Sequence, residues 1–379
     1  MELYIHIPFC IQKCRYCDFA SFAGMESGME AYIDDLLLEC DQQPETLRAR
    51  EITSVYIGGG TPSILPADLF HRLMEGLNER FHILPDCEWT CEANPGTLTE
   101  EWLDAACYGG VNRLSMGMQA KQSSLLNMLG RIHQYADVQH SVSLTRLHGI
   151  HNISLDLMFG LPGQTPAMWE ETLHAAVDLN PCHISCYGLI PEDGTPLKHD
   201  LETGKLVLPD ENIEREMYDT AIHFLHEAGL NQYEISNFAR PGYACRHNIG
   251  YWRQVYYLGL GVSASSMLPC PDAAYVRKTN PSTIKEYEAV LSGISRPDVQ
   301  IISKDEAMFE TLMLGLRMND GVHEDAFQAM HGISLEEYRG TVLQKQIRAG
   351  LMVHEEGAYR LTRRGMDIQN SILVELMDP

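Results

Sequence analysis

The sequence predicts an α/β protein with a partial (βα)6 barrel of the TIM type, followed by a smaller, mainly helical, winged-helix-like domain at the C-terminus. Two observations carry this prediction. Short apolar runs alternate with longer segments of helical period at a spacing of roughly 30–40 residues, a pattern typical of βα units and a parallel sheet. From about residue 300 the composition changes to helical segments followed by two short strand candidates around Glu356-Gly357.

The expected elements follow one another in a regular order. The candidate strands are LYIHI (3–7), SVYIGG (54–59), EWTCEA (88–93), RLSMGM (113–118), ISLDLMFG (153–160) and HISCYGLI (183–190). Segments with helical period cover 31–40, 66–81, 166–179 and 215–229, whereas the polar, turn-rich stretch 191–212 predicts a loop. We therefore expect the barrel in residues 1–230, a connecting segment with an aromatic-rich motif in 231–299, and the C-terminal domain in 300–379.

The net charge limits which classes of partner this chain is expected to bind. It has 379 residues, 45% of them hydrophobic, and 28 basic against 52 acidic residues give a formal net charge of −24. Such a chain repels phosphate backbones, so nucleic acid is not an expected partner. The winged-helix-like tail alone would suit a DNA-binding regulator. Residues 301–379 carry eight Lys/Arg against thirteen Asp/Glu, a net charge of −5, which argues against that alternative.

The first residues and the cysteine count bear on the compartment. MELYIHIPFC has neither a basic n-region nor a long apolar h-region, and no stretch of about 18 uninterrupted apolar residues predicts a membrane span. Eleven cysteines, an odd number, indicate a reducing compartment, where closely spaced thiols bind metal more often than they form disulfides. We expect a cytoplasmic protein.

The most informative motif is a cysteine triplet directly after the first strand. Cys10, Cys14 and Cys17 form a C-x3-C-x2-C run, and thiolates are natural ligands for iron–sulfur clusters. Three cysteines can hold three corners of a [4Fe–4S] cubane and leave the fourth iron open to a small molecule. A zinc site or three unrelated thiols are the alternatives. Structural zinc usually has four ligands in two separated pairs, and no partner pair is evident in the sequence.

At this triplet a family resemblance becomes specific. The run HIPFC…C..CDF is similar to that of the radical SAM superfamily, and in particular to its oxygen-independent coproporphyrinogen-oxidase-like branch. EANPGT, GLPGQT (160–165) and the helical tail extend the resemblance over nearly the whole chain. The resemblance implies that S-adenosylmethionine chelates the open iron, where an electron from the cluster can cleave the sulfonium and give a deoxyadenosyl radical.

Glycine and polar residues near the ends of later strands indicate a nucleoside pocket. The run GGGTP (58–62) follows the second strand, and glycine lets a backbone approach a ligand closely. Glu92 and Gln119 end the third and fourth strands, where barrels of this kind build their sites, although each alone could be an ordinary polar residue at a loop mouth. Arg131 is expected in the helical segment that follows, and Asp156 in the fifth strand. The resemblance implies that S-adenosylmethionine is bound by Tyr4, Tyr16, Gly59, Gly60, Thr61, Glu92, Gln119, Arg131, Asp156 and Gly188.

A second motif, CRHNIGYW (245–252), indicates heme. His and Tyr are axial ligands of heme iron, and aromatic rings offer flat apolar surface to a porphyrin. His247 and Tyr251 are four residues apart, so one helical turn places both on one face. An aromatic-rich turn with a buried histidine is the alternative interpretation, and Cys245 is a weaker alternative ligand. The string HNxxYW resembles the signature of the HemW-type heme chaperones, which implies that His247 binds heme while Asn248, Tyr251 and Trp252 shape its pocket.

One departure separates two functions within this branch. The oxidases carry an extra cysteine two residues after the third cluster ligand, where this chain has Phe19. The resemblance therefore implies a chaperone that binds heme, a [4Fe–4S] cluster and S-adenosylmethionine, and that delivers heme to respiratory proteins. Heme is expected at the mouth of the barrel, held through His247, and transient contact with a membrane surface is left open. The alternatives are an oxygen-independent coproporphyrinogen III oxidase and a radical SAM methyltransferase, so enzymatic turnover stays undecided at this point.

Overall fold

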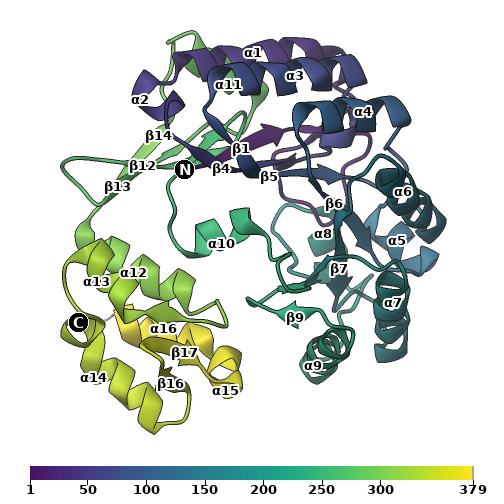
Figure 1. Ribbon diagram of the computed structural model, residues 1–379. Helices are drawn as coiled ribbons and strands as arrows, with labels where there is room; N and C mark the ends of the chain where they lie inside the picture. The colour runs from purple at the N-terminus through teal and green to yellow at the C-terminus, as the bar shows by residue number, and fades with distance from the viewer. Residues whose placement is uncertain (378–379) are drawn as a thin grey trace.

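A curved sheet of parallel strands forms the first part of the molecule (Figure 1). The computed structural model describes residues 1–377. All six predicted strands are present, parallel and adjacent in chain order: β1 (Glu2–Ile7), β4 (Ile52–Gly59), β5 (Ile83–Ala93), β6 (Arg113–Gln119), β7 (Asn152–Phe159) and β8 (His183–Gly188). The prediction of a partial (βα)6 barrel is confirmed.

Helices cover the outer, convex face of this sheet (Figure 1). They are α1 (Met29–Gln42), α3 (Ala67–Arg80), α4 (Glu100–Gly109), α6 (Tyr135–Leu147), α7 (Pro166–Asp178) and α9 (Glu211–Glu227). The four predicted helices are among them, each displaced by only a few residues at its ends. Local chemistry explains where α7 begins: the Thr165 hydroxyl accepts a hydrogen bond from the Met168 amide, and Pro166 occupies the first turn.

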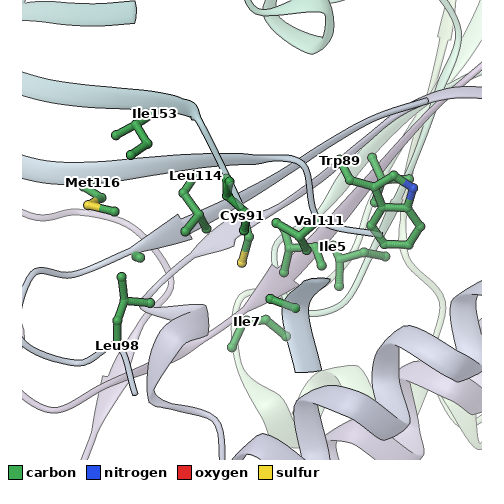
Figure 2. Packing of buried hydrophobic residues seen from close by; sticks show 14 of the residues in the cluster. Ile5, Ile7, Trp89, Cys91, Leu98, Val111, Leu114, Met116 and Ile153 are labelled. Atoms are coloured by element: carbon green, nitrogen blue, oxygen red, sulfur yellow. The ribbon is translucent and has the colours of Figure 1, made fainter. Parts of the chain in front are cut away.

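Side chains alternate along each strand between the helix layer and the inside of the barrel. In β6, Leu114 and Met116 are fully buried and pack with residues such as Cys91 of β5 in the hydrophobic core (Figure 2). The intervening residues line a cavity inside the barrel: Arg113, Ser115, Gly117 and Gln119. The same two-residue period therefore builds an apolar core on one face of the sheet and a polar interior on the other.

The segment 231–299 adds strands to both edges of the same sheet. β10 (Asn237–Ala239) and β9 (Asn231–Gln232) continue it antiparallel beyond β8. At the other edge β11 (Tyr257–Leu260) pairs parallel with β1. Three antiparallel strands follow it: β12 (Ser265–Pro269), β13 (Tyr275–Thr279) and β14 (Asp298–Ile302). Sequence reasoning missed these edge strands because they lack long buried runs, as the mostly exposed β14 illustrates.

The loop prediction for residues 191–212 was wrong in part. This stretch contains a short helix, α8 (Pro196–Glu202). The Thr195 hydroxyl accepts a hydrogen bond from the Lys198 amide at 3.3 Å, and Pro196 fills the first helical position. The Gly-Thr-Pro run that looks like a turn is therefore a helix start.

The C-terminal domain has a separate hydrophobic core. Its elements are α12 (Lys304–Gly315), β15 (Val322–His323), α13 (Glu324–His331), α14 (Leu335–Arg348), β16 (Met352–Glu355), β17 (Ala358–Leu361), α15 (Arg363–Asp367) and α16 (Gln369–Met377). β16 and β17 form a hairpin whose turn residues Glu356 and Gly357 take positive φ angles of 53° and 72°. The winged-helix-like prediction is thus confirmed, while the last two residues of the expected range 300–379 lie outside the described residues. In residues 1–377 no helix is long and apolar enough to cross a membrane.

Glu234 lies where the barrel meets the C-terminal domain. Its backbone forms an antiparallel bridge with Met318. The side chain is 0% exposed, and one carboxyl oxygen accepts a hydrogen bond from the Ser236 amide at 3.1 Å, while the other has no partner within the described chain. Burial raises the pKa of this carboxyl from 4.5 to about 7.

We predict that Glu234→Gln removes a pH dependence of stability. In the fold the carboxyl keeps its proton up to about pH 7, whereas the unfolded chain releases it near 4.5. This contribution to the free energy of unfolding is therefore fully present below pH 4.5 and is lost as the pH rises through about 7. In urea unfolding on both sides of this window, the variant should lose about 1–3 kcal/mol less than the wild type. The exposed-site control Glu216→Gln should behave as wild type, and an equal loss in all three chains would contradict the prediction.

Candidate functional site

One cavity inside the barrel gathers most of the residues that the sequence singles out. It has a volume of about 350 Å³ and reaches from the cysteine loop after β1 to α10 (Arg246–Trp252), a helix on the concave side of the sheet (Figure 1). Eight of the ten residues expected to bind S-adenosylmethionine line it: Tyr16, Gly59, Gly60, Thr61, Glu92, Gln119, Arg131 and Asp156. The three motif cysteines and Asn248 line it as well.

The motif cysteines are free thiols, each partly buried. Cys10 Sγ accepts a hydrogen bond from Thr61 Oγ1, and Cys14 Sγ accepts one from Arg131 Nη1, each at 3.5 Å. Such donors stabilise the thiolate, which is the form that binds iron. Within residues 1–377 no three His, Cys, Asp or Glu side chains are grouped to hold a single metal ion. The corners of a cubane belong to different irons, so thiols on one loop fit a cluster without converging on one point.

The glycines at the end of β4 allow the backbone to pass close to its neighbours. A Cβ at Gly60 would lie 2.5 Å from the Phe9 carbonyl oxygen. Gly59 has a φ of +110°, and a Cβ there would lie 2.5 Å from the His6 ring. Only glycine fits both positions, and the open space in front of them belongs to the cavity.

Two half-buried carboxyl groups face the cavity from β5 and β7. Glu92 accepts hydrogen bonds from Tyr56 Oη at 2.9 Å and from the Gly59 amide at 3.1 Å. Burial, and then the nearby Asp156, raise the pKa of Glu92 to about 7. Burial also raises the pKa of Asp156, whose oxygens both accept from Ser115 Oγ at 3.2 Å. A cationic ligand group would favour the ionised form of both carboxyls, so this side of the cavity suits an ammonium or sulfonium.

Arg131 lies beyond a helix rather than in one, which corrects the prediction. The helix α5 (Ser123–Leu129) ends at Gly130, whose left-handed φ of 74° stops it. The Arg131 guanidinium donates to Asn94 Oδ1 at 2.7 Å and to the Gly117 carbonyl at 2.8 Å. These bonds fix its charge beside Cys14, where it can bind a ligand carboxylate.

Tyr4 and Gly188 are not brought together with the other eight residues. The Tyr4 hydroxyl lies 3.0 Å from His6 Nδ1. Gly188 lines a neighbouring cavity of about 620 Å³, together with Phe159 and Glu214.

His247 lies inside the barrel rather than at its mouth, contrary to expectation. Its side chain is 1% exposed and contacts Glu2 and Ser54 near the beginnings of β1 and β4, whereas the cysteine loop follows the end of β1. Nδ1 is 2.9 Å from Ser54 Oγ and Nε2 is 2.9 Å from Tyr251 Oη, so both ring nitrogens are engaged. Burial, and then the charge of Arg113, lower the pKa of His247 to about 3. Burial raises the pKa of Glu2 to about 8, so the two groups, 3.8 Å apart, meet as neutral partners near pH 7.

The other residues of the HNxxYW motif point in different directions. Asn248 lines the cavity. Tyr251 packs edge-on against His247, with ring centroids 4.7 Å apart. Trp252 faces the C-terminal domain, where the guanidinium carbon of Arg317 lies 5.6 Å from its ring centroid. A Glu88 carboxylate oxygen anchors the helix by accepting from the Arg246 and His247 amides at 2.9 and 3.3 Å.

Several cavity residues escaped sequence reasoning. Tyr56, Asn94, Arg113 and Ser115 line the cavity beside the residues that were predicted. A signal for three of them was available, because Arg113 and Ser115 precede Gln119 by even numbers of residues and Asn94 follows Glu92 by two. Even spacing in a strand places side chains on the same face.

Comparison with known proteins agrees with this geometry. The model of the radical SAM superfamily matches residues 4–176, and that of the HemN C-terminal domain matches residues 302–368. The chain is 33% identical to the heme chaperone HemW of Lactococcus lactis subsp. lactis over 374 residues, covering 99% of this chain and 96% of that protein. It is 35% identical to HemW of Bacillus subtilis over 372 residues, covering 97% of each. The coproporphyrinogen III oxidase HemN from Escherichia coli superposes with a TM-score of 0.84 over 100% of this chain and 90% of that one, and at 23% identity this likeness shows the fold alone.

The barrel, the cysteine loop and the C-terminal domain define a radical SAM protein with a HemN-type C-terminal domain. Identity above 30% over nearly the full length of several relatives is more specific than the fold. The chain belongs to the HemW family of heme chaperones.

We predict that replacing Cys10, Cys14 or Cys17 by Ser abolishes reconstitution of a [4Fe–4S] cluster, because each thiolate would hold one corner of the cubane. Iron and sulfide contents after anaerobic reconstitution measure the effect. Cys182→Ser is the matched control, since this partly buried thiol lies outside the cavity and donates to the His151 carbonyl. Full iron and sulfide in any of the three motif variants would refute the ligand assignment.

Gly250 sets how closely α10 packs on β1. A Cβ at this position would lie 1.9 Å from Glu2 Oε1. We predict that Gly250→Ala lowers the free energy of unfolding by about 1–3 kcal/mol, the usual cost of overpacking. Gly28→Ala is the control, because a Cβ there meets nothing within 4 Å. If urea unfolding gave both variants the same stability, this packing of α10 would be wrong.

Proposed function

We propose that this chain is a heme carrier in which a [4Fe–4S] cluster and S-adenosylmethionine control the binding or release of heme rather than drive turnover. The observation that carries the proposal is the shared cavity. Asn248 of the HNxxYW motif lines the same space as Cys10, Cys14 and Cys17, although about 230 residues separate them in the chain. A heme held by this motif would therefore lie next to the cluster and its ligand.

The residues of the cavity fit both groups. Cys10, Cys14 and Cys17 would bind three irons, and the bound cluster would supply an electron and an open coordination site for S-adenosylmethionine. Glu92 and Asp156 suit the cationic groups of the nucleoside, and Arg131 suits its carboxylate. The other residues named from the resemblance keep that proposed role, including Tyr4 and Gly188, which are the two that do not line the cavity.

His247 is the proposed heme ligand. Its imidazole is neutral, so no proton has to leave before iron binds. Because Nε2 bonds Tyr251 and Nδ1 bonds Ser54, one of these contacts must break when heme arrives. We expect the exchange at Nε2, since Tyr251 belongs to the short helix α10 and Ser54 to a central strand.

The position of Phe19 favours a carrier over an oxidase. Phe19 lines the cavity and is 59% exposed, so the site where the oxidases have their extra cysteine offers no thiol here. We further propose that the acceptors are respiratory heme proteins, reached in the cytoplasm or during transient contact with a membrane surface. The eleven free cysteines are consistent with a reducing compartment.

The test is a heme titration of the anaerobically reconstituted chain, followed by the Soret band. We predict that His247→Ala weakens heme binding at least roughly 10-fold, the smallest loss expected when a metal site is damaged, and shifts the Soret band. His183→Ala is the matched control. His183 is equally buried and lies between Ser154 and Tyr233 at 2.8 and 2.9 Å, but it is outside the motif.

Three results would count against these proposals. Unchanged affinity and spectrum in His247→Ala would refute His247 as the ligand. Absence of heme binding in the wild type would refute the carrier. Decarboxylation of coproporphyrinogen III or methylation of an acceptor, with deoxyadenosine or adenosylhomocysteine as the coproduct, would show turnover instead.

A further inference from the structure

The interior of the barrel holds a buried cation that forms few hydrogen bonds. Arg113, the first residue of β6, is 2% exposed and lines the cavity described above. Its Nε has no hydrogen-bond partner among residues 1–377, and the bond from Nη1 to Thr90 Oγ1 is long, at 3.4 Å. Within the same part of the chain its guanidinium forms no ion pair.

This arrangement is unusual for a buried charge. Buried charged groups are normally paired and fully hydrogen-bonded, because removal from water is otherwise costly. Arg131, in the same cavity, meets this rule through Asn94, Gly117 and Cys14. Arg113 does not, and yet it stays charged: burial opposes its ionisation, but Cys245 and Glu88 raise the pKa of the guanidinium.

The histidines near Arg113 do not compete for an anion. His247 lies between Ser54 and Tyr251, and His183 lies between Ser154 and Tyr233, so each imidazole is held by a serine and a tyrosine. Burial, and then the charge of Arg113, lower the pKa of both rings, which are therefore neutral. Arg113 is the cation at the α10 end of the cavity, as Arg131 is beside the cysteines.

We propose that Arg113 binds a carboxylate of a ligand that enters this cavity. A guanidinium recognises a carboxylate through two parallel hydrogen bonds, which would use the free Nε. This inference rests on the proposed function, whose two organic ligands both carry carboxylates: the propionates of heme and the methionine part of S-adenosylmethionine. Because Arg131 already lies at the cysteine end and Arg113 lies near the HNxxYW motif, a heme propionate is the expected source.

The size of the cavity agrees with an entering arm rather than a whole porphyrin. Ligand pockets usually have volumes of about 300–1,000 Å³. At about 350 Å³ this cavity lies at the lower end of that range. The inference requires only that a propionate arm, and not the whole macrocycle, enters the cavity.

The experiment compares wild type, Arg113→Gln and Arg113→Lys as full chains with reconstituted cluster. Each is titrated with heme, with heme dimethyl ester and, by calorimetry, with S-adenosylmethionine. We expect Arg113→Gln to bind heme roughly 10- to 100-fold more weakly, the loss typical of a charge-assisted hydrogen bond, and Arg113→Lys to lose less. The ester should bind wild type and Arg113→Gln equally. Arg80→Gln is the matched control, because Arg80 pairs with Asp41 on the surface and does not line the cavity.

Each of the following outcomes decides between the sources or rejects the inference. A loss confined to heme assigns a propionate, and a loss confined to S-adenosylmethionine assigns the methionine carboxylate. Unchanged affinity for both ligands, in variants with full cluster content and wild-type thermal stability, overturns the proposal. If neither variant folds, the wild type decides: weaker binding of the ester than of heme supports the proposal, and equal binding marks Arg113 as structural.

Failure of the proposed function gives a different pattern. If the wild type bound neither heme nor its ester, the carrier would be refuted, and the S-adenosylmethionine titrations would still test Arg113. A loss in the Arg80→Gln control would show that the effect comes from total charge rather than from this residue.

Discussion

The site depends on one constraint, the two-residue alternation of side chains along parallel strands. Each strand must bury apolar side chains under the helices, which fixes the other half of its residues in the interior. In β6 this puts Leu114 and Met116 in the core and Arg113, Ser115 and Gln119 inside the barrel. A closed TIM barrel fills this space with branched apolar side chains. Here the interior is polar, so the chain must satisfy buried polar groups while leaving room for a ligand.

The helix α10 is the solution to that problem on the concave side. A polar helix end inside a barrel needs partners for its free amides, and the Glu88 carboxylate supplies them. His247 is saturated by Ser54 and Tyr251, and the same serine–histidine–tyrosine arrangement recurs at His183. Neutral imidazoles with both ring nitrogens hydrogen-bonded add no charge to the interior. Neither ring nitrogen of His247 is therefore free to bind a metal, and a heme iron would have to replace an existing hydrogen bond.

Sequence reasoning succeeded for features that depend on residues close together in the chain. The six strands are short apolar runs, the cysteines share one loop, and the glycines at the end of β4 form one run, so each could be recognised locally. It failed where the meaning of a residue depends on distant partners. The depth of His247 is set by contacts with Glu2 and Ser54, which lie about 245 and 190 residues away in the chain. The helix end before Arg131 is a local feature that was overlooked, because the neighbouring Gly130 takes a left-handed φ. In the sequence Arg113 looks like an ordinary polar residue, and only the structure shows how few hydrogen bonds its buried guanidinium forms.

The shared interior also gives a physical reason for a carrier to keep a cluster site. Charges in a poorly hydrated space interact over longer distances than they do in water. A cationic nucleoside beside Glu92 and Asp156 would favour the ionised form of both, because burial raises the pKa of each carboxyl and brings that of Glu92 to about 7. A new negative charge on Glu92 would change the field at Arg113 and hence its affinity for a carboxylate. Thermodynamic linkage makes such an effect reciprocal, so a ligand at the α10 end would alter binding at the cysteine end by the same factor. Binding at the cluster end and binding at the heme motif can thus be coupled through charge alone, without radical chemistry.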